Sequence, residues 1–139
     1  MRFVVDTNVL ISALIKPQSV PGQALFQCRQ KGTLLFSEET KGELFSVIQR
    51  PRFTRYIDPN WIVEQANQIV QQAEVVKITS AIKIECRDLT DVKFFQLAVD
   101  AKANCLISGD FDLLEKNMVL GVPVMTPSYF LVWLSAHNG

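Results

Sequence analysis

The amino-acid sequence predicts an α/β protein in which a mostly parallel sheet carries helices on both faces. Short apolar runs alternate along the chain with longer stretches that show helical signals, which is typical of βαβ units. Between residues 94 and 101 the apolar residues recur at i, i+3, i+4 and i+7, as on a helix that packs against a sheet. The chain has 139 residues, 48% of them hydrophobic, and this size and composition fit one packed domain over residues 1–139.

The first half of the chain is expected to begin with a buried strand at residues 3–5 and a helix at residues 8–15. A loop with two prolines, residues 16–22, separates this helix from the next one at residues 23–30, which Gly32 ends as a C-cap residue. Residues 33–36 form the second strand. Ser37 is placed to cap a helix that runs to about Arg50 and is stopped by Pro51.

The second half repeats the alternation. We expect a helix at residues 61–73 capped by Asn60, a strand at residues 74–78, a helix from Thr90 onward and a strand at residues 104–108. A short helix after Asp110, a strand at residues 122–125 and a helix at residues 127–133 complete the domain. Pro123 predicts that the last strand lies at an edge of the sheet, because proline cannot donate to a central ladder.

Charge and scarce residues exclude several functional classes. Lys plus Arg is 14 and Asp plus Glu is 14, so the formal net charge is zero. Nucleic acid would therefore have to be bound through a local patch or through metal ions. His137 is the single histidine, which argues against Ser-His-Asp and Cys-His mechanisms because both need a positioned imidazole.

The cysteines and the apolar runs indicate the compartment. Cys28, Cys86 and Cys105 are an odd number and contain no C-x-x-C pair, which fits a reducing cytosol better than a disulfide scaffold or a zinc site. The apolar run at the N-terminus is too short for a signal peptide, and the run at residues 130–134 is too short to cross a membrane. We therefore expect a cytoplasmic protein with no membrane partner.

Carboxylates stand at the predicted ends of strands and starts of helices. Asp6 closes the first strand, and Asp110 and Asp112 follow the strand at residues 104–108. Glu43 lies on the third predicted helix, and Asp91 opens the helix that begins near Thr90. Ligands of an open parallel sheet bind beyond the carboxyl ends of its strands, so these acids can share one crevice. Clustered acids repel one another unless a cation neutralises them, and oxygen ligands favour Mg²⁺ or Mn²⁺. Such ions activate water toward a phosphodiester without any histidine.

Most of these acids also have a purely structural interpretation. Asp91 suits the positive end of a helix dipole, Asp110 and Asp112 fit an Asx turn, and Glu43 fits a solvated helix face. Asp6 favours a functional role more strongly. Its carboxylate directly follows buried valines, where an unpaired charge is expensive.

Four motifs in order resemble PIN-domain nucleases. They are VVDTNVL (residues 4–10), SEETKGEL with RPRF (37–44 and 50–53), CRDLTDVKF (86–94) and LISGDFDLL (106–114). Any one of them is weak, whereas four with this order and spacing are specific. The subgroup that they resemble most, VapC-like, comprises toxins of prokaryotic toxin–antitoxin pairs.

The resemblance implies a three-layer α/β/α, Rossmann-like fold with a parallel sheet ordered 3-2-1-4-5. It implies an endoribonuclease that depends on Mg²⁺ or Mn²⁺ and cleaves single-stranded RNA. The family's metal-binding catalytic acids match Asp6, Glu43, Asp91 and Asp110, with Asp112 as an auxiliary ligand. Thr7 and Asn8 match positions that support the first acid, although Thr7 equally fits a cap of the first helix. The implied partners are RNA and a cognate antitoxin, and a homodimer or higher homo-oligomer stays open.

One departure keeps other functions open. The family often has Asp-Pro-Asp-Asp before the third acidic helix, where this chain has DLTD at residues 88–91. Asp88 either compensates for the missing acid or caps the helix. A catalytically silent module that binds RNA or protein is therefore one alternative. A phosphohydrolase with Asp6 as nucleophile is another, but Asn8 stands where such enzymes commonly carry a second Asp.

Basic and aromatic residues add two more alternatives. Arg50, Arg52 and Arg55 form either a solvated turn or a local edge for RNA phosphates, and the zero net charge favours the turn. Phe130 and Trp133 are expected to fill the core or a dimer seam rather than to stack on bases.

Overall fold

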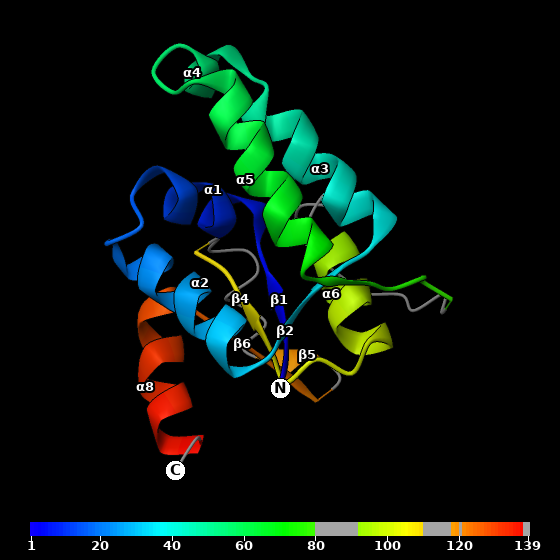
Figure 1. Ribbon diagram of the computed structural model, residues 1–139. Coiled ribbons are helices and arrows are strands. Elements are labelled where there is room, and N and C mark those ends of the chain that lie inside the picture. Colours follow the sequence, from blue (N-terminus) through cyan, green and yellow to red (C-terminus); the bar gives the residue numbers. More distant parts are fainter. Residues whose placement is uncertain (80–91, 110–117, 120, 138–139) are drawn as a thin grey trace.

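The sheet of this protein is doubly wound, as the sequence predicts. The computed structural model describes residues 1–79, 92–109, 118–119 and 121–137 (Figure 1). In this part of the chain the strand order is β3-β2-β1-β4-β6-β5. The strands are β1 Arg2–Val5, β2 Thr33–Phe36, β3 Glu74–Val75, β4 Cys105–Ile107, β5 Met118–Val119 and β6 Val122–Met125.

The five parallel strands confirm the predicted order. Taken in chain order without β5, the strands β3-β2-β1-β4-β6 read 3-2-1-4-5, and each neighbouring pair is parallel. The strand β1 therefore lies between β2 and β4, with Phe3 in register with Leu34 on one side and with Cys105 on the other. Any residue directly after β1 stands near the middle of the carboxyl edge of the sheet.

Seven helices of the described chain surround this sheet. They are α1 Thr7–Ile15, α2 Val20–Lys31, α3 Glu38–Ile48, α4 Pro51–Thr54, α5 Pro59–Gln71, α6 Val92–Asp100 and α8 Pro127–His137. The helix that the sequence predicts after Asp110 lies outside the described residues. Within the described chain, no helix combines the length and the apolar character that crossing a bilayer requires.

Two hydrophobic cores pack on opposite faces of the sheet and make the three layers. Phe3 and Val5 of β1 face the core that α1, α2, α3, α5 and α8 cover. Val4, between them, faces the second core, where α6 contributes Phe94 and Phe95. This alternation follows from the two-residue period of a strand, and it gives β1 two buried faces. Figure 1 shows α6 set apart from the α1, α2 and α8 side of the sheet.

Several local expectations were wrong. The helix α5 begins at Pro59 and is capped by Asp58, whose Oδ1 accepts a hydrogen bond from the Asn60 backbone N–H at 2.9 Å, so Asn60 is not the cap. Proline is favoured in the first turn of a helix, which explains the earlier start. The short helix α4 after Arg50 was not expected. The strand β3 has two residues rather than five.

The predicted edge position of the strand β6 was also wrong. The strand β5 pairs with β6 in antiparallel orientation and takes the outer place. Pro123 is tolerated because it precedes Val124 and Met125, the two residues of β6 in register with β4. Its missing N–H therefore falls outside that ladder.

Candidate functional site

Asp6 stands at the carboxyl end of the central strand β1 and holds two local contacts at once. Its backbone N–H continues the ladder by donating to the Ile107 carbonyl at 2.9 Å. Its side chain is the N-cap of α1, with Oδ1 accepting from the Asn8 backbone N–H at 3.3 Å. Only 5% of the residue is exposed. The cap is therefore Asp6 itself and not Thr7, which settles one alternative left by the sequence.

Ser108 holds the other oxygen of the same carboxylate. Its Oγ donates to Asp6 Oδ2 at 2.8 Å, and Ser108 is completely buried. The two residues meet because β1 and β4 are parallel neighbours and each is the first residue beyond its strand. Sequence reasoning missed Ser108, although a hydroxyl directly after a buried apolar strand was a usable signal. Both oxygens of Asp6 thus have defined directions.

Glu43 is brought to this place by the helix α3. Ser37 caps α3, and its side chain and that of Thr40 form a reciprocal capping box, which fixes where the helix starts. The carboxylate of Glu43 then reaches the start of α1, where Thr7 Oγ1 donates to Glu43 Oε2 at 3.0 Å. The side chain of Glu43 is 30% exposed, so it is not the freely solvated residue that its position on a helix alone suggested.

Lys93 contacts the same carboxylate from the helix α6. Its Nζ lies 3.5 Å from Glu43 Oε2, and its side chain is 10% exposed. The ammonium group also lies 5.5 Å from the centroid of the Phe94 ring. Sequence reasoning missed this lysine too. A positive charge in the first turn of a helix opposes the helix dipole, and that conflict was the available signal.

The remaining predicted site residues divide into two groups. Asn8 is exposed and contributes its backbone N–H to Asp6, while its side chain lines a nearby cleft. Asp91, Asp110 and Asp112 lie outside the described residues. Within the described part of the chain, no group of three His, Cys, Asp or Glu residues is close enough to hold a metal ion. The structure therefore joins Asp6, Thr7 and Glu43, and leaves the other three acids as predictions.

A cleft of about 400 Å³ opens beside Asp6. Small polar side chains line it together with Gly109 and the starts of the three helices α1, α2 and α8. Its lining residues are Asp6, Asn8, Val9, Ser12, Val20, Pro21, Gly109, Thr126, Pro127 and Ser128. The cleft lies beyond the carboxyl ends of β1, β4 and β6, where ligands of parallel sheets bind.

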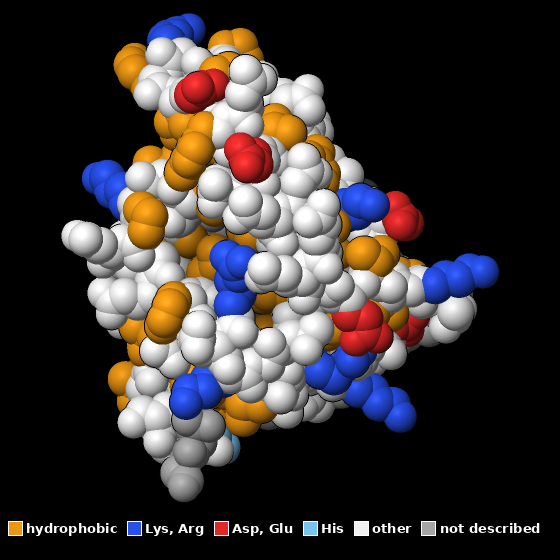
Figure 2. Space-filling model, viewed as in Figure 1, with side chains coloured by type: hydrophobic (Ala, Val, Ile, Leu, Met, Phe, Trp, Pro, Cys, Tyr) orange, Lys and Arg blue, Asp and Glu red, His pale blue; other side chains and the backbone are white. Residues whose placement is uncertain are grey.

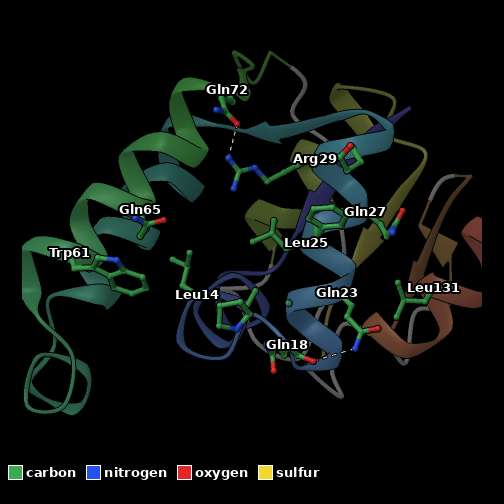
Figure 3. A pocket seen from close by; sticks show the side chains of 15 residues that line it. Leu14, Gln18, Gln23, Leu25, Gln27, Arg29, Trp61, Gln65, Gln72 and Leu131 are labelled. Carbon is green, nitrogen blue, oxygen red and sulfur yellow. Dashed lines mark hydrogen bonds between the residues drawn. The ribbon is translucent and has the colours of Figure 1, made fainter.

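A second cleft, of about 740 Å³, lies between α1, α2 and α5 (Figure 3). Glutamines and apolar groups line it, and the Arg29 Nη2 donates to Gln72 Oε1 at 2.6 Å across it. Among its described lining residues there is no carboxylate, so it lacks the acid chemistry found at the smaller cleft. On the face seen in Figure 2, basic and acidic side chains are interspersed rather than gathered by sign.

The described cysteines are part of the core rather than of the site. Cys28 and Cys105 are free thiols with no exposed surface. Burial raises the pKa of the Cys105 thiol to about 12. Burial, and then the neighbouring Cys105, raises the pKa of Cys28 further. Such thiols are poor nucleophiles, which agrees with the expected structural role.

The domain is doubly wound, and the buried Asp6 and the partly exposed Glu43 are held by hydrogen bonds near the carboxyl edge of its sheet. Domains of this class bind their ligands at that edge. Comparison with known families makes the class specific. The family model of the PIN domain matches residues 2–112. The chain belongs to the PIN-domain family.

One sequence relative and three solved structures are similar to this chain. The uncharacterized protein MJ1680 of Methanocaldococcus jannaschii is 29% identical over 143 residues, covering 94% of this chain and 90% of that protein. The fold is similar to that of VapBC2 from Rickettsia felis bound to a DNA fragment from its promoter. The TM-score is 0.63 and the identity 11%, over 91% of this chain and 98% of that chain. VapBC-1 from nontypeable Haemophilus influenzae has a TM-score of 0.61 and 12% identity, over 92% of this chain and 99% of that chain. PAE2754 from Pyrobaculum aerophilum has a TM-score of 0.61 and 14% identity, over 97% of this chain and 89% of that chain.

Proposed function

We propose that this protein is a divalent-metal-dependent endoribonuclease that cleaves single-stranded RNA. We further propose that it acts in the cytoplasm as the toxin of a toxin–antitoxin pair. Membership of the PIN-domain family supports nuclease chemistry, because PIN domains are generally nucleases. Two fold neighbours are VapBC proteins, which supports an antitoxin partner. A homodimer or higher homo-oligomer is part of the same proposal.

One observation carries the proposal: the two contacts that hold the buried carboxylate of Asp6 at the carboxyl edge of the sheet. Ser108 donates to Oδ2 and the Asn8 backbone donates to Oδ1. An acid buried at such a place is expensive unless it has partners or a function, and here the partners fix its direction. Thr7, the next residue, ties Glu43 to the same region. Two predicted site acids are thereby anchored to one short stretch of backbone.

The donor set fits a hard divalent cation. Asp6 and Glu43 offer carboxylate oxygens, and among the described residues no thiol or imidazole stands with them. Oxygen ligands suit Mg²⁺ and Mn²⁺ better than Zn²⁺. We propose Asp6, Glu43, Asp91 and Asp110 as the ligands, with Asp112 auxiliary. When bound, the ion would supply an activated water and charge neutralisation at the phosphodiester.

The protein's own side chains do the positioning. Ser108 and the Asn8 backbone hold the two oxygens of Asp6, and Thr7 holds Glu43. Preorganised ligands of this kind lose little rotamer freedom when substrate arrives. The adjacent cleft of about 400 Å³ gives the substrate access to Asp6 from solvent.

Cleavage of labelled single-stranded and double-stranded RNA tests the proposal. EDTA should abolish cleavage of the single strand, and Mg²⁺ or Mn²⁺ should restore it better than Zn²⁺. Asp6→Asn should remove activity while the fold is retained. Asp58→Asn is the matched control, since Asp58 caps α5 by the same kind of contact and asparagine caps as well as aspartate. Cleavage that survives exhaustive chelation would refute the mechanism, and RNA binding without cleavage would favour the silent module.

A further inference from the structure

We propose that Lys93 is an internal counter-cation that competes with the divalent ion for Glu43. This inference deepens the proposed function and rests on the metal site described there. It starts from one contact, the Lys93 ammonium 3.5 Å from Glu43 Oε2.

The position of Lys93 is costly on local grounds. It is the second residue of α6, where a cation meets the positive end of the helix dipole. Its side chain is 10% exposed, so a long and flexible group has given up both water and rotamer freedom. Both the helix dipole and the burial of the charge oppose a lysine at this position. The contacts that offset the cost include the carboxylate of Glu43 and the face of the Phe94 ring.

Glu43 Oε2 is shared between two donors from different elements. Thr7 Oγ1 donates to it from α1 at 3.0 Å, and the Lys93 ammonium approaches it from α6. The hydrogen bond from Thr7 contributes to the position of the carboxylate without involving Lys93. Lys93 adds a full positive charge to the same oxygen.

A divalent ion on Glu43 would meet that charge at close range. Bound to Oε2 at the usual Mg²⁺–oxygen distance of about 2.1 Å, it would stand at most about 5.6 Å from Nζ in the present arrangement. Even in the dielectric of bulk water, repulsion between charges of +2 and +1 at that separation corresponds to about tenfold in affinity. The ammonium thus neutralises Glu43 in the metal-free protein and opposes binding of the ion to the same carboxylate.

Titration of Mn²⁺ into the full chain tests this inference without RNA. Binding is measured by calorimetry and by the electron paramagnetic resonance signal of free Mn²⁺. Lys93→Met should bind Mn²⁺ about tenfold more tightly than the parent. It should also melt at a lower temperature without metal and gain more on adding Mn²⁺. Lys93→Arg keeps the charge and should retain the affinity of the parent. Lys41→Met is the matched control, because Lys41 carries the same charge on α3 but pairs with the exposed Glu38.

The outcomes separate this inference from the proposed function. A parent that binds Mn²⁺, with Lys93→Met unchanged or weaker, overturns the inference and leaves the metal site standing. A parent that binds no Mn²⁺ overturns both. If Lys93→Met does not fold without metal, Lys93→Gln compared with Lys93→Arg carries the same contrast between a neutral and a charged side chain. If Lys41→Met raised the affinity for Mn²⁺ as much as Lys93→Met, the effect would come from the overall charge of the protein. That result would also refute the inference.

Discussion

Replacing Ser108 by alanine removes the hydroxyl that donates to Asp6. The rest of the side chain is unchanged, so the substitution introduces no new bulk. The Oγ–Oδ2 distance is 2.8 Å, Ser108 is fully buried and Asp6 is 5% exposed, so water cannot replace the lost donor without rearrangement. A hydrogen bond to a charged group contributes about 1.5–3 kcal/mol, and we expect Ser108→Ala to lose that amount. For a chain of 139 residues this corresponds to a melting temperature lower by about 5–10 °C.

Thermal and urea unfolding followed by circular dichroism measures this loss. Ser12→Ala is the matched control, because Ser12 lines the same cleft but is exposed on α1, and its replacement should stay within about 0.5 kcal/mol. A double-mutant cycle with Asp6→Asn should give a coupling of at least about 1 kcal/mol. A melting temperature for Ser108→Ala equal to that of Ser12→Ala, with no coupling, would show that the hydroxyl does not support Asp6.

The same contact should matter for the proposed metal site, and three other features give independent predictions. Ser108→Ala should weaken Mn²⁺ binding about 10- to 100-fold in calorimetry, because it removes a partner of a proposed ligand. Gly32→Ala should lower the melting temperature by several degrees, since its Cβ would lie 2.1 Å from the Met1 carbonyl oxygen; an unchanged melt would contradict this backbone contact. Lys102 has a φ of 53° after α6, so Lys102→Gly should stabilise the fold by about 0.5–1 kcal/mol in urea unfolding, and a loss of stability would refute it. The raised pKa values of Cys28 and Cys105 mean that the unfolded thiols ionise before the folded ones as the pH rises. The free energy of unfolding should therefore keep its full thiol contribution below pH 9. Above pH 9 it should fall, for each thiol, by up to about 1.4 kcal/mol per pH unit, so the fall should be steeper in the parent than in Cys105→Ala.

The sequence patterns were sufficient for a parallel sheet with helices on both faces, because this architecture depends on apolar periodicity that repeats over many residues. The sheet order was instead an implication of the resemblance to PIN-domain nucleases, and the structure confirms it. The apolar run of β1 is buried on both faces, and the stripe of α6 faces the second core, as the periodicity predicts. The position of Asp6 at the end of β1 followed from the same pattern. The boundaries of α5 and the place of β6 depend instead on one cap and on a two-residue pairing, which carry little signal in a sequence.

The partners of the site were harder to predict because they are decided by neighbours in space. Ser108 closes a predicted strand, but its role depends on β4 lying next to β1 and on the side chain pointing toward Asp6. Lys93 lies in the motif that contains Asp91, yet the carboxylate that it contacts is Glu43 on another helix. Asp91, Asp110 and Asp112 stay predictions, since they lie outside the described residues.

The hydrogen bond between Ser108 and Asp6 joins residues 102 positions apart in the sequence. This separation determines how late in synthesis the carboxylate of Asp6 can be oriented. During translation Asp6 leaves the ribosome early, whereas β4 emerges only after about three quarters of the chain has been made. Until then β1 has no neighbour on its β4 side, and Asp6 lacks the donor that fixes one of its oxygens. A nascent or truncated chain that ends before β4 therefore cannot form the oriented carboxylate.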